Sequence, residues 1–300
     1  MKYLRRLLCR HRKVTLACLL CLCFLLQACG GSLRNILASD DSSAESDRRE
    51  LEAAGDSLRE RGELQMAFVN YEKALKLSPD DPVLIYKEGL VSLAADRSDD
   101  ALKDFNRALA INPEYAPAWE GAGEAFFRKG DMDKARDAFY RALQLDPALW
   151  KCHNKLGLIY DRRGRHGPAI LEYRQAIELN PRDGALYNNL GVSYTYNQEY
   201  DAAVTALNRA IELNYAEKKV YNNLGLALGL MQRYDAALEA FRKAGSEAQA
   251  RNNLGVVYLN QRKYDKAIEA FEKAIELEPS YYTTAGENLK KARLAIEQQQ

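Results

Sequence analysis

The chain has 300 residues, of which 47% are apolar and 28% charged, a composition typical of a folded protein rather than a disordered one. The first 28 residues contain six basic and no acidic side chains, which leaves 37 basic and 42 acidic side chains in the rest. A mildly acidic body without a basic stripe argues against a nucleic-acid partner, because binding to phosphates needs a basic face.

The N-terminus has the order of parts of an export signal: a basic start, an apolar run from Leu16 to Leu26, and then small residues. The alternative is a membrane-spanning anchor, because residues 14–33 are 20 uncharged positions. The apolar part ends at Leu26, however, and the residues after it are poorly suited to hydrocarbon. We therefore expect residues 1–28 to be a signal peptide.

The segment Leu26-Gln27-Ala28-Cys29 resembles the bacterial lipoprotein signal. The resemblance implies that Cys29 carries acyl chains and becomes the first residue of the mature protein. Several chains on one residue also meet the physical requirement for stable anchoring. Because Gly30 rather than Asp follows the cysteine, the resemblance implies the outer membrane, with the folded part facing the periplasm. If Cys29 is not modified, an inner-membrane-anchored regulator is the alternative.

Cysteine usage agrees with export, because five of the six cysteines lie in or at the end of the signal. Only Cys152 remains in the folded part, so no internal disulfide is possible there, and its apolar neighbours predict burial. The segment that follows the signal, residues 29–47, is rich in Ser, Asp and Gly and predicts a flexible tether.

Small residues repeat from residue 48 onward with a period of 34, and once of 30. An alanine follows each glycine after twelve residues, a second alanine after nineteen, and an aromatic residue lies between the two alanines in every unit except that of Leu207. The glycines stand at positions 55, 89, 123, 157, 191, 225 and 255.

This spacing resembles the tetratricopeptide repeat (TPR), with seven units over residues 48–281. The predicted fold is all-α: a right-handed α-solenoid of about seven helical hairpins, with residues 282–300 as a capping helix and tail. Helices that cross closely need small residues at the contact, so we expect the glycine of each first helix to meet an alanine of the second.

The motif YNNLG occurs at residues 187–191 and 221–225, and NNLG at 252–255. With each glycine as the eighth position of its unit, the asparagines occupy the fifth and sixth positions. One interpretation is packing between adjacent helices. The other is a groove for an extended or helical polypeptide, because an amide both donates and accepts and can grip a backbone. The predicted groove residues are Asn154, Leu158, Asn188, Asn189, Val192, Asn222, Asn223, Leu226, Asn252, Asn253 and Val256.

The sequence after the export signal has no pattern typical of a catalytic, phosphate-binding or metal-binding site. It contains two histidines, one cysteine, no glycine-rich phosphate loop and no metal-ligand spacing. His153 occupies a fourth-position packing slot, where we expect a role in the core, and we expect His166 to be solvated in a turn between helices. We therefore expect no catalytic residues, cofactor, metal site or small-molecule substrate, and we expect partners to be other proteins.

The run FRKAGSEAQARNNLGVVYLNQRKYDKAIEAFEKAIELEPSYY, with its shortened joint, resembles the tight-adherence (Flp-type) pilus assembly lipoproteins. The resemblance implies a periplasmic adaptor that helps a secretin ring or a pilus machine to assemble. A scaffold that brings cell-wall hydrolases and proteases together is the alternative of a different class.

Overall fold

The computed structural model describes residues 43–215, 217–278 and 282–298, and every regular element in these ranges is an α-helix. The predicted signal peptide, Cys29 and the predicted tether up to residue 42 lie outside the described residues. The first described helix covers residues 43–60. Residues 43–47, which we expected to end the tether, therefore belong to the first hairpin.

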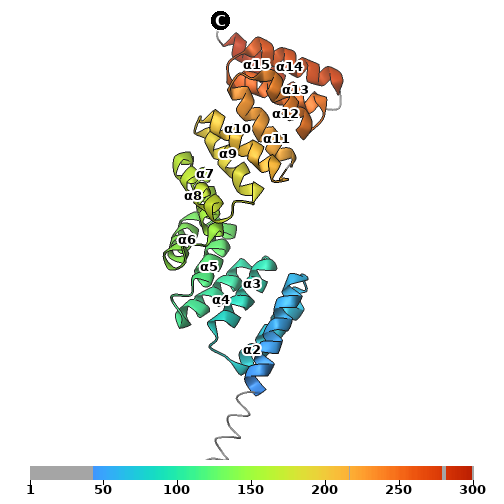
Figure 1. Ribbon diagram of the computed structural model, residues 1–300. Helices are drawn as coiled ribbons and strands as arrows, with labels where there is room; N and C mark the ends of the chain where they lie inside the picture. The colour runs from blue at the N-terminus through green and yellow to red at the C-terminus, as the bar shows by residue number, and fades with distance from the viewer. Residues whose placement is uncertain (1–42, 216, 279–281, 299–300) are drawn as a thin grey trace, which may run out of the picture. The chain divides into compact units, whose positions relative to one another are not determined.

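The described residues divide into two compact units, one up to Pro113 and one from Glu114 onward. In the first unit, the helix of residues 43–60 pairs with α2 (Leu64–Leu77), and α3 (Pro82–Ala94) pairs with α4 (Ser98–Ile111). The second unit contains five hairpins and the final helix α15 (Tyr282–Glu297) (Figure 1). Its hairpins are α5 (Ala116–Lys129) with α6 (Met132–Leu145), α7 (Trp150–Arg162) with α8 (His166–Leu179), α9 (Gly184–Tyr196) with α10 (Tyr200–Glu212), α11 (Lys218–Leu230) with α12 (Tyr234–Ala244), and α13 (Glu247–Asn260) with α14 (Tyr264–Leu277).

The repeated glycines contact the aromatic residue of the second helix, and not chiefly its alanines as we expected. A Cβ atom on Gly157 would lie 2.6 Å from a ring carbon of Tyr173, and that ring is fully buried. Gly191 is the variation, since its Cβ would lie 2.6 Å from Leu207 Cγ and 3.2 Å from the carbonyl oxygen of Ala203. The alanines flank the ring and are buried with it, so small residues surround a large one in each hairpin.

One tight turn joins the two helices of every hairpin. The residue at the centre of this turn has a positive φ angle in all seven hairpins, at positions 62, 96, 130, 164, 198, 232 and 262. Three of these residues are glycine, the residue that adopts this conformation at no steric cost. The 34-residue period of the sequence is therefore also the period of the backbone.

Glu88 on α3 breaks the apolar pattern of the seventh position, which is leucine in the four hairpins that begin with α7, α9, α11 and α13. Its side chain is buried, with 6% of its surface exposed. Burial raises the pKa of Glu88 to about 7, and the carboxylates of Asp104 and Glu72 add to the rise while Arg107 opposes it. The first unit thus holds a carboxyl group that is protonated below neutral pH.

This carboxyl group predicts a pH-dependent stability. Between pH 4.5 and 7 the unfolded chain releases the Glu88 proton while the folded chain keeps it, so the folded state loses stability as the pH rises. We expect Glu88→Gln to have the stability of the unsubstituted chain near pH 4 and to exceed it by about 2 kcal/mol above pH 7. Urea unfolding at a series of pH values measures this difference. Glu60→Gln, at an exposed position, is the control, and an equal response of the two variants would contradict the prediction.

Candidate functional site: the asparagine ladder

Four successive first helices, α7, α9, α11 and α13, present the predicted groove residues. On each of them the fifth-position asparagine and the ninth-position aliphatic residue are four residues apart, so both side chains lie on the same side of the helix. Asn188 and Val192 on α9 are an example. We call this side of the four helices the ladder face, defined by Asn154, Leu158, Asn188, Val192, Asn222, Leu226, Asn252 and Val256.

The asparagines of neighbouring hairpins form hydrogen bonds with one another. In each case Nδ2 of a sixth-position asparagine donates to Oδ1 of the fifth-position asparagine in the preceding hairpin. The bonds are Asn189 to Asn154 at 3.1 Å, Asn223 to Asn188 at 2.9 Å and Asn253 to Asn222 at 3.1 Å. We call this series of side chains the asparagine ladder.

The last bond of the asparagine ladder comes from the final helix. Asn288 Nδ2 on α15 donates to Asn252 Oδ1 at 3.0 Å, so α15 takes the place of a next first helix. Sequence reasoning did not single out Asn288. The sequence does contain a feature that could have identified it: Asn288 follows Asn252 by 36 residues, close to the 35 residues that separate earlier ladder partners.

The asparagine ladder continues through the shortened joint between α12 and α13. There the partners Asn253 and Asn222 are 31 residues apart instead of 35. The joint is closed by a capping box, in which the Ser246 hydroxyl accepts from the Gln249 amide and the Gln249 side chain accepts from the Ser246 amide. Removing four residues therefore shortens α12 but keeps α13 in register with α11.

Burial decides what the ladder amides can contact. Asn188 and Asn252 are buried, with 5% and 4% of their surfaces exposed, and the other predicted asparagines are partly buried. Their amide groups are occupied by the asparagine ladder, which accounts for the repeated asparagine pair as packing between hairpins. Gripping a partner's backbone through these amides stays a prediction, and it would require some ladder bonds to break.

The aliphatic residues of the ladder face are partly buried rather than fully covered. Leu158, Val192, Leu226 and Val256 each follow a ladder asparagine by one helical turn. Leu158, Leu226 and Val256 also pack with one side against buried core residues. A row of apolar side chains, most of them packed on the core, thus runs beside the asparagine ladder.

Charged side chains replace the asparagines in earlier hairpins. Lys87 occupies the sixth position of its hairpin and Glu52 the fifth position of the preceding one, and Lys87 Nζ lies 2.7 Å from Glu52 Oε1. In the second unit, the sixth-position Lys155 on α7 pairs instead with the ninth-position Glu124 on α5, at 2.8 Å. The fifth and sixth positions of neighbouring hairpins therefore hold an ion pair at Glu52 and Lys87 and amide pairs from α7 onward.

Asp161 at the end of α7 organises a polar cluster beside the ladder face. The hydroxyls of Ser193 and Tyr173 donate to its Oδ2 atom at 2.6 and 3.0 Å. His166 Nδ1 lies 2.9 Å from Asp161 Oδ1, and the His166 ring stacks on Tyr196 with centroids 5.2 Å apart. We had expected His166 to lie in a solvated turn, but it begins α8 and is partly buried in this cluster.

The other two residues considered for chemistry have structural roles. Cys152 is fully buried in the core between α5, α6 and α7, as predicted, and burial raises the pKa of its thiol. His153 Nδ1 lies 2.7 Å from Glu172 Oε2 on α8, so it joins the two helices of its own hairpin. Within the described ranges no three His, Cys, Asp or Glu side chains gather as metal ligands would.

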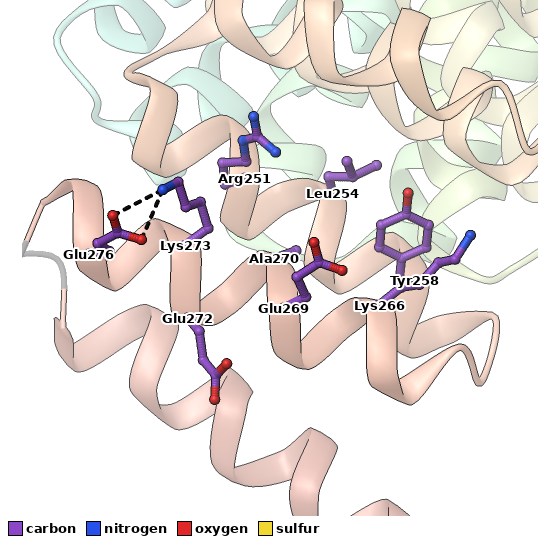
Figure 2. Close-up of a pocket in the computed structure, with 9 residues that line it drawn as sticks. All are labelled: Arg251, Leu254, Tyr258, Lys266, Glu269, Ala270, Glu272, Lys273 and Glu276. Carbon is purple, nitrogen blue, oxygen red and sulfur yellow. Dashed lines mark hydrogen bonds and ion pairs between the residues drawn. The ribbon is translucent and has the colours of Figure 1, made fainter.

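A separate hollow of about 630 Å³ lies over α13 and α14 (Figure 2). Leu254 and Ala270 are apolar members of its lining, and charged side chains surround them. Among them, Lys273 pairs with Glu276 at 2.9 Å, and Glu272 pairs with Arg293 of α15, outside the lining, at 2.7 Å. Helical spacing places this hollow on a different side of α13 from the ladder face, and its balanced charge indicates no particular ligand.

The stacked hairpins and their repeated glycine contacts define a tetratricopeptide-repeat solenoid, a class of protein-interaction scaffold. The family model described as "Cilia and flagella-associated protein 70 C-terminal domain" matches residues 25–253, and the model described as "Tetratricopeptide repeat" matches residues 248–281. The first match covers well over half of the chain, so the chain belongs to this tetratricopeptide-repeat family.

Solved structures agree on the fold. The C-terminal part of a TPR repeat-containing protein from Cytophaga hutchinsonii matches at 19% identity with a TM-score of 0.59, over 79% of this chain and 99% of that one. The APC/C hetero-tetramer Cut9-Hcn1 matches at 24% identity with a TM-score of 0.57, over 79% of this chain and 48% of that one. At these identities the likeness shows the architecture alone.

A curated relative matches over a shorter range. The TPR repeat-containing thioredoxin TTL4 of Arabidopsis thaliana is 27% identical over 88 residues, which are 29% of this chain and 13% of that protein. The chain thus spans about an eighth of that relative. Separately, none of the helices in residues 43–215, 217–278 and 282–298 combines the length and the apolar character that crossing a membrane requires.

The asparagine ladder predicts measurable coupling between hairpins. Asn188→Ala should leave the Asn223 amide without its acceptor and lower the free energy of unfolding by about 1–3 kcal/mol. The double variant with Asn223→Ala should be less destabilised than the sum of the single variants, by about 1 kcal/mol. Asn188 with Asn253, which share no bond, should be additive. Urea unfolding of the five variants measures both quantities, and equal coupling in the two pairs would rule out the ladder as its source.

Proposed function

We propose that the ladder face binds a polypeptide partner through its aliphatic row, and that the asparagine ladder holds this row in place. The observation that supports the proposal is that the asparagine row and the aliphatic row make different contacts. The amides bond to one another, while Leu158, Val192, Leu226 and Val256 keep part of their apolar surface accessible. Apolar residues repeated on successive helices suit the apolar side of a helical or extended partner segment.

The occupant is a polypeptide rather than a small molecule because the row is long and repetitive. Each hairpin from α7 to α13 contributes one equivalent position, and a chain-like partner can meet all four at once. Tetratricopeptide repeats as a class bind peptides and proteins in such a groove. Asn189 and Asn223 are only partly buried, so contact with them would add polar specificity at the edge of the row.

We further propose that the folded part hangs from a lipid on Cys29 and faces the periplasm from the outer membrane. The support is the sequence Leu26-Gln27-Ala28-Cys29, which resembles a lipoprotein signal and lies outside the described residues. In this position the chain would act as an adaptor for a pilus or secretion machine of the tight-adherence type, whose assembly lipoproteins its last repeats resemble. Organising cell-wall hydrolases or proteases is the alternative, and inner-membrane regulation is the alternative if Cys29 is unmodified.

Site-specific photo-crosslinking in cells tests the ladder face. A photoreactive residue at Val192 or at Leu226 should trap the same partner, because both positions lie on one row. The control is Glu239 on α12, which is exposed and lies outside the ladder face. Mass spectrometry of the trapped species distinguishes secretin or pilus components from cell-wall hydrolases. Equal trapping of the same species at Glu239 would refute a specific ladder face.

Replacing Cys29 by Ser tests the anchor. We expect the variant to take up no labelled palmitate and to leave the membrane fraction, because acyl chains supply the binding energy that the rest of the chain lacks. Cys152→Ser is the matched control and should keep both label and membrane association. A Cys29→Ser chain that stays in the membrane fraction without label would favour the inner-membrane alternative.

A further inference from the structure

The first hairpin has an uncovered apolar hollow on its outer side. Leu51 and Ala54 from the helix of residues 43–60 and Leu77 from α2 line it, and its volume is about 620 Å³. Leu77 has 44% of its surface exposed. All of the described residues that line the hollow belong to the first hairpin.

The equivalent place is covered in later hairpins. Ala54 occupies the seventh position of its unit, and it is exposed. In the last four hairpins of the second unit this position holds leucine, at residues 156, 190, 224 and 254, and these leucines have at most 8% of their surfaces exposed. Each lies on a first helix that contacts the second helix of the hairpin before it. An exposed seventh position is therefore a sign of a missing neighbour, as expected at the end of a repeat stack.

The C-terminal end of the second unit shows how this chain covers such a face. The helix α15 packs on α14, and Ala285 and Ala292 of α15 are fully buried. Leu289 packs against the core residues Ala267 and Phe271. A single segment with apolar residues at helical spacing is sufficient to close the C-terminal end.

The chain before residue 43 contains one segment of this kind. Leu33, Ile36 and Leu37 have the spacing i, i+3 and i+4, which places three apolar side chains on one side of a helical turn. The five residues 38–42 can span up to about 17 Å. The rise from the start of the first helix to Leu51 is about 12 Å, so the segment can reach the hollow.

The charges that line the hollow and those of the segment around residues 33–37 are complementary. Asp47 and Glu50 line the hollow on the side of the first helix, and Lys73 and Lys76 line it on the side of α2. The segment carries Arg34 within it and Asp40 and Asp41 behind it. An orientation that places Arg34 toward the acidic side and the two aspartates toward the lysines brings opposite charges together on both sides.

We propose that residues 33–37 dock into this hollow and cap the first hairpin. This docking does not depend on the lipid anchor or on the ladder face. Where Cys29 is anchored, docking leaves only residues 30–32 between the anchor and the capped body, so the scaffold is held close to its attachment point. Release of the segment would lengthen the connection to residues 30–42.

Photo-crosslinking within the full-length chain tests the docking. A photoreactive residue at Ala54 should form a crosslink to residues 33–37 of the same molecule, mapped by mass spectrometry of the monomer band. The control is Glu60, which is exposed on another side of the same helix and should give no such crosslink. Crosslinks from Ala54 to a second copy or to a different polypeptide, or none at all, would overturn the proposal.

Hydrogen exchange provides an independent measurement. Replacing Leu33, Ile36 and Leu37 together by Ser should speed amide exchange over residues 43–60 on the order of tenfold, because a covered face becomes open. Exchange in α13 should not change. Asn35→Ser, in the same segment but outside its apolar side, is the matched control. Unchanged exchange in the triple variant would show that residues 33–37 do not cap the hairpin.

Discussion

The close approach of each repeated glycine to a large buried side chain of the partner helix, a ring in six hairpins and Leu207 in the other, is the contact on which the rest of the structure depends. A ring such as Tyr173 can lie against the backbone of the partner helix only because Gly157 has no side chain. Six contacts of this type, together with the contact of Gly191 with Leu207, fix how the two helices of each hairpin cross. Because the hairpins are alike, the first helices repeat at regular intervals, and side chains at equivalent positions come into contact between neighbours.

The asparagine ladder is a consequence of this regular stacking. Neighbouring first helices bring the fifth position of one hairpin next to the sixth position of the following one, and an amide pair satisfies both groups. Glu52 and Lys87 meet in the same way with opposite charges. In the function proposed above, the row of aliphatic side chains beside them is the surface for a partner, because the polar groups are occupied between hairpins. Rigidity and the proposed binding then belong to adjacent positions of one helix.

Much of the fold could be predicted from the sequence because the same pattern of small residues occurs in every repeat. Glycine at the eighth position of every unit and two alanines after it identify the helical hairpins, and Cys152 was correctly expected to be buried. The repeated asparagines also indicated the helices that carry the asparagine ladder, and a role of these helices in binding stays a prediction. The predictions from sequence were wrong about which residues contact each other. Gly157 contacts Tyr173 rather than chiefly an alanine, and His166 is stacked on Tyr196 instead of solvated.

The sequence by itself determined the hairpins, their number and the face on which the asparagines lie, because these follow from local periodicity. Only the tertiary structure decided what the asparagines bind, because a hydrogen-bond partner 35 residues away is chosen by how hairpins stack. It also decided that Asn288 completes the series and that Glu88 is buried beside other acids. Contacts within one hairpin repeat along the chain and can be read from it, whereas contacts between hairpins depend on distances that spacing alone does not fix.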